Sequence, residues 1–294
     1  MADITWSLLA LQGVTGIALG AIYALLAMGL SLIFGMLTVV NFAHGAFFMV
    51  GAYFGVYFYE LTGNFWFSLL LVPLATGASG LFTERFLVRP LYGRGIDYPL
   101  LLTFGLSYVL VDAMRFVFGI EGLPSNTPAE LRGATQLGFG HFPTYRLFLI
   151  FAAAVVIGGL WLFIEKTRFG LIIRAGARDP EIVKVLGIHV ARFWLLVFCL
   201  GTAIAGLAGA LAAPTRAVNP EMGITVLAES FVVTVVGGMG SLPGAVVAGL
   251  LVGLVFSFTS LLAPEFAELS IFVLMALVLL VRPQGLFGKA GLMG

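Results

Sequence analysis

Apolar runs of roughly 20 residues alternate with short polar segments along most of the chain. A helix of that length crosses the hydrocarbon core of a bilayer, so repeated runs indicate a multi-pass membrane protein. The pattern predicts an all-α polytopic membrane protein in which residues 1–294 form a single transmembrane domain. The expected spans cover residues 6–34, a run ending near 60, 65–84, a run ending at 118, 147–164, 193–214, a run ending near 262, and 270–281.

One further apolar run, residues 224–236, is too short for a comfortable crossing. It is either a short full span or part of a re-entrant hairpin, so we expect eight or nine transmembrane helices. Residues 119–146 are polar and rich in proline, glycine and asparagine. This composition predicts a loop.

Two glycine-containing sequences interrupt apolar runs: NFAHG at 41–45 and GGMGSLPG at 237–244. Each follows Thr-Val-Val, at 38–40 and at 234–236, and each leads into Gly-Ala and a helix with spaced glycines. Broken helices in both halves of a transporter are typical of an inverted repeat with a substrate site between the halves. We expect such an internal repeat, although matches this short also arise by chance in apolar sequence.

A charged segment at 165–192 contains six of the 15 Lys and Arg residues and lies between two apolar runs. Within it, Asp179-Pro180-Glu181 is a typical helix start, and Gly187 is a typical helix end. The short helix between them would have an apolar face of Ile182, Val183 and Leu186. Such a helix at a membrane surface suits a groove on a soluble partner. A solvated loop with one surface helix is the alternative.

Composition agrees with the membrane assignment, because hydrophobic residues make up 61% of the chain and the mean hydropathy is +1.10. The net charge of +1 and the scattered basic residues do not favour nucleic-acid binding. A single cysteine, Cys199, cannot form an internal disulfide. The N-terminus lacks the positive region of a cleaved signal peptide, so we expect the first span to stay in the protein.

Sequence motifs for catalysis are missing. The chain has no phosphate-binding loop of the G-x-x-x-x-G-K-[ST] type, no HExxH and no G-x-S-x-G. The three histidines, at 44, 141 and 189, lie in separate regions. We therefore expect no catalytic residues, no metal site and no cofactor in this chain. Energy for any transport would come from a partner ATPase or an ion gradient.

Basic residues predict the orientation. If 165–192 is cytoplasmic, the segment 85–97 and the C-terminal tail lie on the same side, which then holds 11 of the 15 Lys and Arg residues. The N-terminus would be outside and the C-terminus in the cytoplasm. The basic residues left on the outer side are Arg115, Arg132, Arg146 and Arg216.

Few ionisable side chains fall inside the apolar runs, and a self-sufficient carrier or channel usually needs such groups along its path. Asp112 and Arg115 are spaced to pair on one helix face. Glu84 lies at a span end. Glu229 is near the start of the short run, where a carboxylate suits a helix N-terminus, so a capping or interfacial role is expected. This scarcity argues against proton or sodium coupling.

The sequences NFAHGAFFMVGAY, RFG…RA…A…D…LGI, VVGGMGSLPGA and LLVRPQGLFG, in this order, resemble permease subunits of branched-chain amino acid ABC importers, the Liv-type H permeases. The resemblance covers nearly the whole chain. It implies a bacterial inner-membrane permease that pairs with a second related permease, two cytoplasmic ATP-binding subunits and an extracytoplasmic substrate-binding protein. The substrate class extends from branched-chain to other amino acids, amides, urea and small carboxylates. A secondary carrier or channel and a sugar-type ABC permease are the alternatives.

The same resemblance makes the charged segment a cytoplasmic coupling segment that binds the ATPases, with ATP bound only by those partners. The residues expected to take part are Arg174, Asp179, Glu181, Ile182, Lys184, Leu186 and Gly187.

A small amino acid that crosses this chain needs polar partners, and the break at 41–45 offers them. We expect the substrate pathway to include Asn41, His44, Gly45, Thr234, Gly237 and Gly238. In the alternative, Asn41 and His44 only satisfy the broken backbone or pack against the partner permease.

Overall fold

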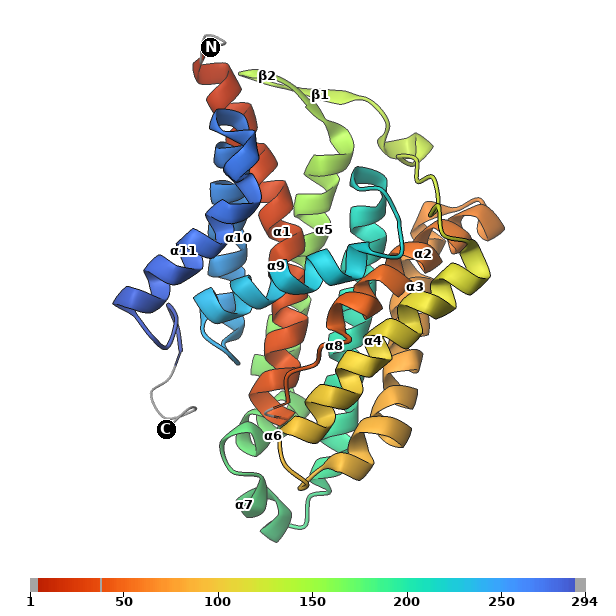
Figure 1. Ribbon diagram of the computed structural model, residues 1–294, viewed down its shortest axis with the longest axis vertical. Coiled ribbons are helices and arrows are strands. Elements are labelled where there is room, and N and C mark those ends of the chain that lie inside the picture. Colours follow the sequence, from red (N-terminus) through yellow and green to blue (C-terminus); the bar gives the residue numbers. More distant parts are fainter. Residues whose placement is uncertain (1–4, 38, 289–294) are drawn as a thin grey trace.

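The computed structural model describes residues 5–37 and 39–288, and it consists almost entirely of helices in this part of the chain (Figure 1). Thr38 of the first Thr-Val-Val, and Lys289 of the basic C-terminal tail, lie outside the described residues. The helices are α1 (Trp6–Leu37), α2 (His44–Thr62), α3 (Phe65–Phe82), α4 (Asp97–Phe118), α5 (Thr144–Lys166), α6 (Arg168–Arg178), α7 (Pro180–Val185), α8 (Val190–Ala212), α9 (Met222–Gly237), α10 (Leu242–Leu262) and α11 (Ala267–Val281).

Seven of the described helices are long and apolar enough to cross a membrane: α1, α3, α4, α5, α8, α10 and α11. Two further helices, α2 and α9, are shorter or less apolar and lie inside the bundle. The prediction of an all-α polytopic membrane protein is confirmed. The expected spans correspond to helices in the expected order.

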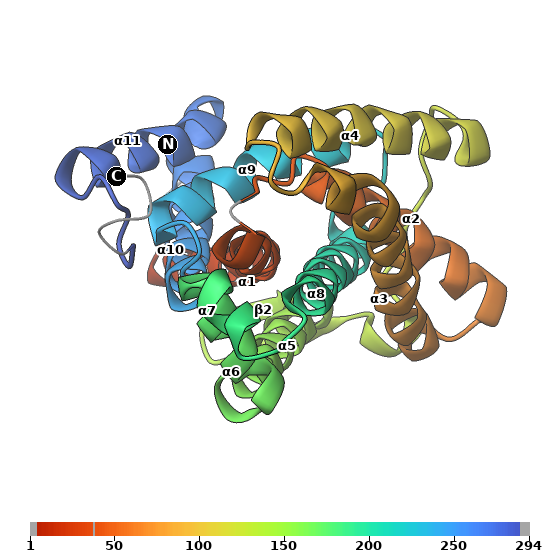
Figure 2. The same cartoon turned by 90° about the horizontal axis from the view of Figure 1, so that it is seen from below.

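Helices α10, α1, α8 and α3 stand side by side in this order, with α1 and α8 in the middle (Figure 2). The helices α1 and α8 cross at two glycines, because a Cβ on Gly29 would lie 2.9 Å from the carbonyl oxygen of Gly201. Where α1 meets α10, a Cβ on Gly20 would lie 2.8 Å from the Cα of Leu250. Such backbone approaches are typical of helices that associate in lipid through small residues.

The contacts that α1, α2, α3 and α4 make are matched by those that α8, α9, α10 and α11 make. Helix α1 packs on α10 as α8 packs on α3, and α2 contacts α3 and α4 as α9 contacts α10 and α11. The first turns of α2 and α9 touch each other at Gly45 and Gly223. This arrangement is consistent with two inverted units, α1–α4 and α8–α11.

The repeat pairs different segments from those that the sequence suggested. The break before α2, residues 39–43, corresponds to the segment before α9, residues 216–221. The sequence 237–244 instead forms the turn between α9 and α10, the counterpart of the turn at Gly63 between α2 and α3. The pairing of 41–45 with 237–244 is therefore wrong, because the shared Thr-Val-Val and Gly-Ala stand at different points of the two units.

The segment expected as a loop contains a β-hairpin. Strands β1 (Ala134–Leu137) and β2 (Gly140–Pro143) pair antiparallel, with Thr135 opposite Phe142, and α5 begins at once after β2. The ring of Phe142 is buried. The hairpin covers the end of the bundle at which α1 begins (Figure 1).

The glycine contacts predict a large effect of one substitution. In Gly253→Leu, the new side chain would meet the backbone of Gly20, which cannot move without separating α1 from α10. We expect a loss of stability of about 3 kcal/mol or more, or failure to fold. Thermal unfolding in detergent micelles measures it. The control is Gly159→Leu on α5, where a Cβ meets nothing within 4 Å, and equal melting temperatures of the two variants would contradict the prediction.

Candidate functional site

The break between α1 and α2 is held by polar side chains inside the protein. Asn41 is fully buried, and its Oδ1 accepts a hydrogen bond from the backbone N–H of Ala43 at 3.1 Å. The N–H of Phe42 donates to Oγ1 of Thr103 on α4 at 3.1 Å. These two bonds replace the helical hydrogen bonds that the chain gives up here. Thr103 was missed in the sequence, where a lone threonine in an apolar run gives no signal.

His44 begins α2 and its imidazole lies between α1 and α8. Its Nε2 is 3.0 Å from the carbonyl oxygen of Leu26, so this nitrogen carries the proton and donates. A Cβ on Gly29 would lie 3.0 Å from the ring, so the imidazole needs a glycine at this point of α1. The other ring nitrogen, Nδ1, has no hydrogen-bond partner among the described residues. The amide nitrogen of Asn41 is in the same situation.

The structure brings together only half of the predicted pathway residues. Gly45 packs against Gly223 and Leu227 in the first part of α9. Thr234, Gly237 and Gly238 lie toward the other end of that helix, 11 to 15 residues from Gly223, or about 16–22 Å along its axis.

Gly237 and Gly238 connect the end of α9 to other parts of the chain, whereas Thr234 bonds within α9. The hydroxyl of Thr234 donates to the Ser230 carbonyl at 2.8 Å. Gly237 accepts a hydrogen bond at 3.0 Å from the N–H of Phe287 in the C-terminal tail. The two glycines contact α10 and residues 285–288.

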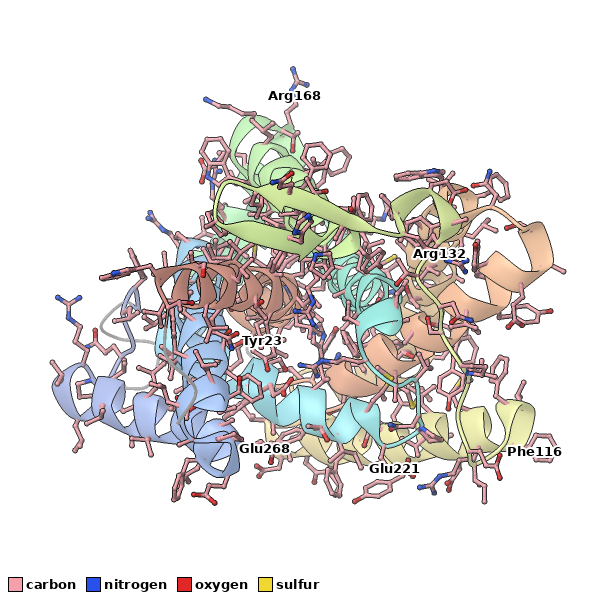
Figure 3. All side chains as sticks on the ribbon, turned by 90° about the horizontal axis from the view of Figure 1, so that it is seen from above. Tyr23, Phe116, Arg132, Arg168, Glu221 and Glu268 are labelled. Carbon is pink, nitrogen blue, oxygen red and sulfur yellow. The ribbon has the colours of Figure 1, made fainter. Side chains whose placement is uncertain are left out.

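A largely buried ion pair lies beside the middle of α1. Nη1 of Arg216 is 3.2 Å from Oε2 of Glu229, and Nη2 is 3.3 Å from the hydroxyl of Tyr23 on α1. The side chain of Tyr23 extends from α1 toward α9 (Figure 3). The expected capping role of Glu229 is wrong, because α9 begins at Met222 and places this carboxylate in its middle. The sequence could not show this pair, since its two residues come from a loop and a helix.

Two other acidic groups also stabilise junctions between elements. Glu84, expected to be an ordinary span-end charge, is buried where α3 continues as a π-helical turn, and lies 3.5 Å from Nε of Arg89. The predicted Asp112–Arg115 pair is present at 2.9 Å. Arg115 also contacts Glu221 at 2.6 Å, next to the start of α9 (Figure 3), and this hydrogen bond lowers the pKa of Glu221.

The charged segment folds as two helices at the end of the molecule opposite the β-hairpin (Figure 1). The predicted helix is α7, and its start and end are as expected. Oδ1 of Asp179 accepts from the N–H groups of Glu181 and Ile182, each at 3.0 Å. At the other end, Gly187 has φ +78° and its N–H donates to Lys184, while Ile188 donates to Val183, which is a Schellman motif.

The apolar face of α7 differs from the prediction. Val183 is only 3% exposed and points into the protein, whereas Ile182, Val185 and Leu186 are 60%, 87% and 71% exposed. Val185 was therefore missed and Val183 wrongly included. The charged pair Glu181–Lys184, at 2.6 Å, lies beside this exposed face.

Helix α6 was not predicted, and it fixes the segment to the transmembrane helices. Thr167 caps it by accepting from the N–H of Gly170 at 3.1 Å. Arg174 pairs with Glu165 at 2.8 Å and donates to the Ile164 carbonyl at 2.6 Å, so its charge stabilises the α5–α6 corner. Gly176 lies beside Met36 at the end of α1.

Two cavities are well defined, with volumes of about 140 and 200 Å³. Both lie near the end of the bundle that carries the β-hairpin, and neither is lined by Asn41 or His44. Asn41 and His44 are fully buried, so the break is closed in this conformation. Among the described residues, no three His, Cys, Asp or Glu side chains are grouped so that they could hold a metal ion.

Residues 13–282 match the family described as branched-chain amino acid transport system / permease component. The chain is 33% identical to the branched-chain amino acid permease protein BraD of Pseudomonas aeruginosa, over 95% of each protein. It is 30% identical to LivH of Escherichia coli K12 over 95% of each protein, and 29% identical to LivM of that strain over 96% of this chain and 72% of LivM. No solved structure gives a match. The chain thus belongs to the family of permease components of branched-chain amino acid transport systems.

Proposed function

We propose that this chain is the transmembrane permease subunit of an ABC importer for branched-chain or related small amino acids. The observation that carries the proposal is the similarity to BraD and LivH along 95% of the chain. The partners would be a second related permease subunit, two cytoplasmic ATP-binding subunits that alone bind ATP, and an extracytoplasmic substrate-binding protein. The similarity to LivM supports a second permease of the same family.

Coupling would use the exposed apolar face of α7. Three large apolar side chains exposed to water beside charged groups form a surface suited to a groove on a soluble ATPase. Helix α7 contacts α8, and α6 contacts both α5 and the end of α1. Movement of α7 would therefore reach α1 directly before the break at 39–43. Of the predicted residues, Asp179 and Gly187 would act by shaping α7, and Arg174 by holding α6.

The orientation we propose has the N-terminus outside and α6–α7 in the cytoplasm of a bacterial inner membrane. It is supported by the shared position of two basic segments, since Arg89 of 85–97 donates to the carbonyl of Ala191 beside α7 at 2.7 Å. Most basic residues then lie on the cytoplasmic side, as is typical of membrane proteins.

The substrate path would pass the closed break at Asn41, His44 and Gly45. Nδ1 of His44 and Nδ2 of Asn41 have no partner among the described residues, so they supply one acceptor and one donor for a substrate. Thr234, Gly237 and Gly238 are too distant to share this site. We assign them a structural role at the end of α9, where it meets α10 and the C-terminal tail.

The coupling proposal predicts the effect of charges on α7. Ile182→Glu combined with Leu186→Glu should abolish substrate-stimulated ATP hydrolysis in the reconstituted complex, because two apolar contacts are replaced by buried charges. The control is Ile120→Glu, an exposed apolar residue of the 119–133 loop. The isolated chain should hydrolyse no ATP. Normal stimulated hydrolysis in the double variant would argue for the solvated-loop interpretation.

The orientation predicts the accessibility of single cysteines. In a Cys199→Ala background, Arg132→Cys should react in intact cells with a thiol reagent that cannot cross the membrane, whereas Lys184→Cys should react only after the membrane is permeabilised. Both side chains are exposed in the structure, so access to the reagent depends on the side of the membrane. The reverse labelling would overturn the orientation.

The path predicts different consequences for two variants of His44. His44→Gln keeps a donor for the Leu26 carbonyl but loses the ring and its Nδ1 acceptor, so it should assemble normally and transport at least tenfold more slowly. His44→Ala loses both and should also be less stable. Substrate uptake and basal ATP hydrolysis in proteoliposomes measure these effects. Full transport by His44→Gln would show that the ring only supports the break.

A further inference from the structure

The larger cavity, of about 200 Å³, lies between α1, α5, α10 and the turn that follows α8. It is at the same end of the bundle as the β-hairpin, because α5 begins directly after β2 and contributes its first two turns. The lining contains polar residues, Thr15, Ser257 and two arginines, and apolar residues, Leu19, Leu149 and Phe256 among them.

The hydroxyl groups of Thr15 and Ser257 already donate their hydrogen bonds to backbone carbonyls. Thr15 donates to the Leu11 carbonyl at 2.9 Å, and Ser257 donates to the Gln12 carbonyl at 2.9 Å. They offer only lone pairs to a ligand. The donors that remain for a ligand belong to the guanidinium groups of Arg146 and Arg216.

These two arginines differ in charge balance. Arg216 is paired with Glu229, as described above. Arg146 has no carboxylate within ion-pair distance among the described residues, and its nearest polar contact is Oγ1 of Thr15 at 3.5 Å. The lining of the cavity therefore carries one positive charge without a carboxylate partner among the described residues.

The position of Arg146 in its helix adds to this imbalance. It lies in the first turn of α5, and Pro143 at the N-cap makes no side-chain capping bond. Cations near a helix N-terminus are unfavourable, because the positive end of the helix dipole repels them. A bound anion at this point would interact favourably with both the guanidinium and the helix terminus.

We propose that this cavity binds an anionic group, a carboxylate or a phosphate, attached to an apolar body. Arg146 would bind the anion, and Leu19, Leu149 and Phe256 would contact the apolar part. Two sources share this chemistry: a free branched-chain amino acid and the head group of an anionic phospholipid. The amino-acid source rests on the proposed function, whereas the lipid source is independent of it.

The test measures binding to the purified full-length chain. The probes are radiolabelled L-leucine and dioctanoyl phosphatidylglycerol, with dioctanoyl phosphatidylcholine as the lipid without net charge. Wild-type protein should bind either L-leucine, through its carboxylate, or phosphatidylglycerol saturably, and Arg146→Gln should weaken that binding by about 10- to 100-fold, as expected for a lost charge-assisted hydrogen bond. Arg132→Gln, which removes an exposed arginine that lines neither described cavity, should bind as the wild type does.

A second variant separates the ligand effect from folding. Leu19→Trp fills apolar space in the cavity without changing its charge. This variant should weaken binding of the same probe. Dependence on Arg146 for leucine alone identifies the substrate as the ligand, and dependence for phosphatidylglycerol alone identifies the lipid. The proposal is overturned if the wild type binds neither probe saturably, if it binds phosphatidylcholine equally well, or if folded Arg146→Gln binds as the wild type does.

Discussion

The fold depends on satisfying the backbone where a helix stops inside the hydrocarbon region, because no water is available there and each unpaired polar group is costly. Between α1 and α2, the carboxamide of Asn41 and the hydroxyl of Thr103 accept the N–H groups that have lost their helical partners. A break of this kind needs buried polar side chains even without a substrate. The polarity of Asn41 is thus weak evidence for a path. His44 is different, since it bonds to Leu26 within the continuous helix α1, where the backbone does not require it.

Close approach of backbones is the second constraint, and it follows from the weakness of the hydrophobic effect between helices in lipid. At Gly51 and Gly206, a Cβ on the first would overlap the backbone of the second, which lets α2 lie directly on α8. The helices α2 and α9 lie inside the bundle, so helices on both sides must pack closely to enclose them. Glycine positions therefore specify which helices are neighbours.

Sequence patterns predicted the elements that depend on local information. Apolar run lengths gave the spanning helices, and the Asp179 cap and Gly187 gave both ends of α7. They failed where the answer depends on distant residues. The partner of Glu229 is Arg216, which depends on where α9 begins and on how it crosses α1. Helix α6 is a different case, because its basic and apolar residues fall on opposite faces at helical spacing, a local signal that the high charge of the segment obscured.

The free energy gained when a partner docks on the exposed face of α7 can be compared with the free energy needed to couple that face to the closed break. Burial of a Val, Leu or Ile side chain contributes about 1.5–3 kcal/mol, so the three exposed residues of α7 would contribute on the order of 5 kcal/mol on docking, before the cost of association. Coupling between two sites in a protein is typically about 1–3 kcal/mol. Docking on α7 is therefore large enough to bias the position of α6 against α1. The contact of Gly176 with Met36, one residue before the last residue of α1, is the shortest connection from that surface to the break.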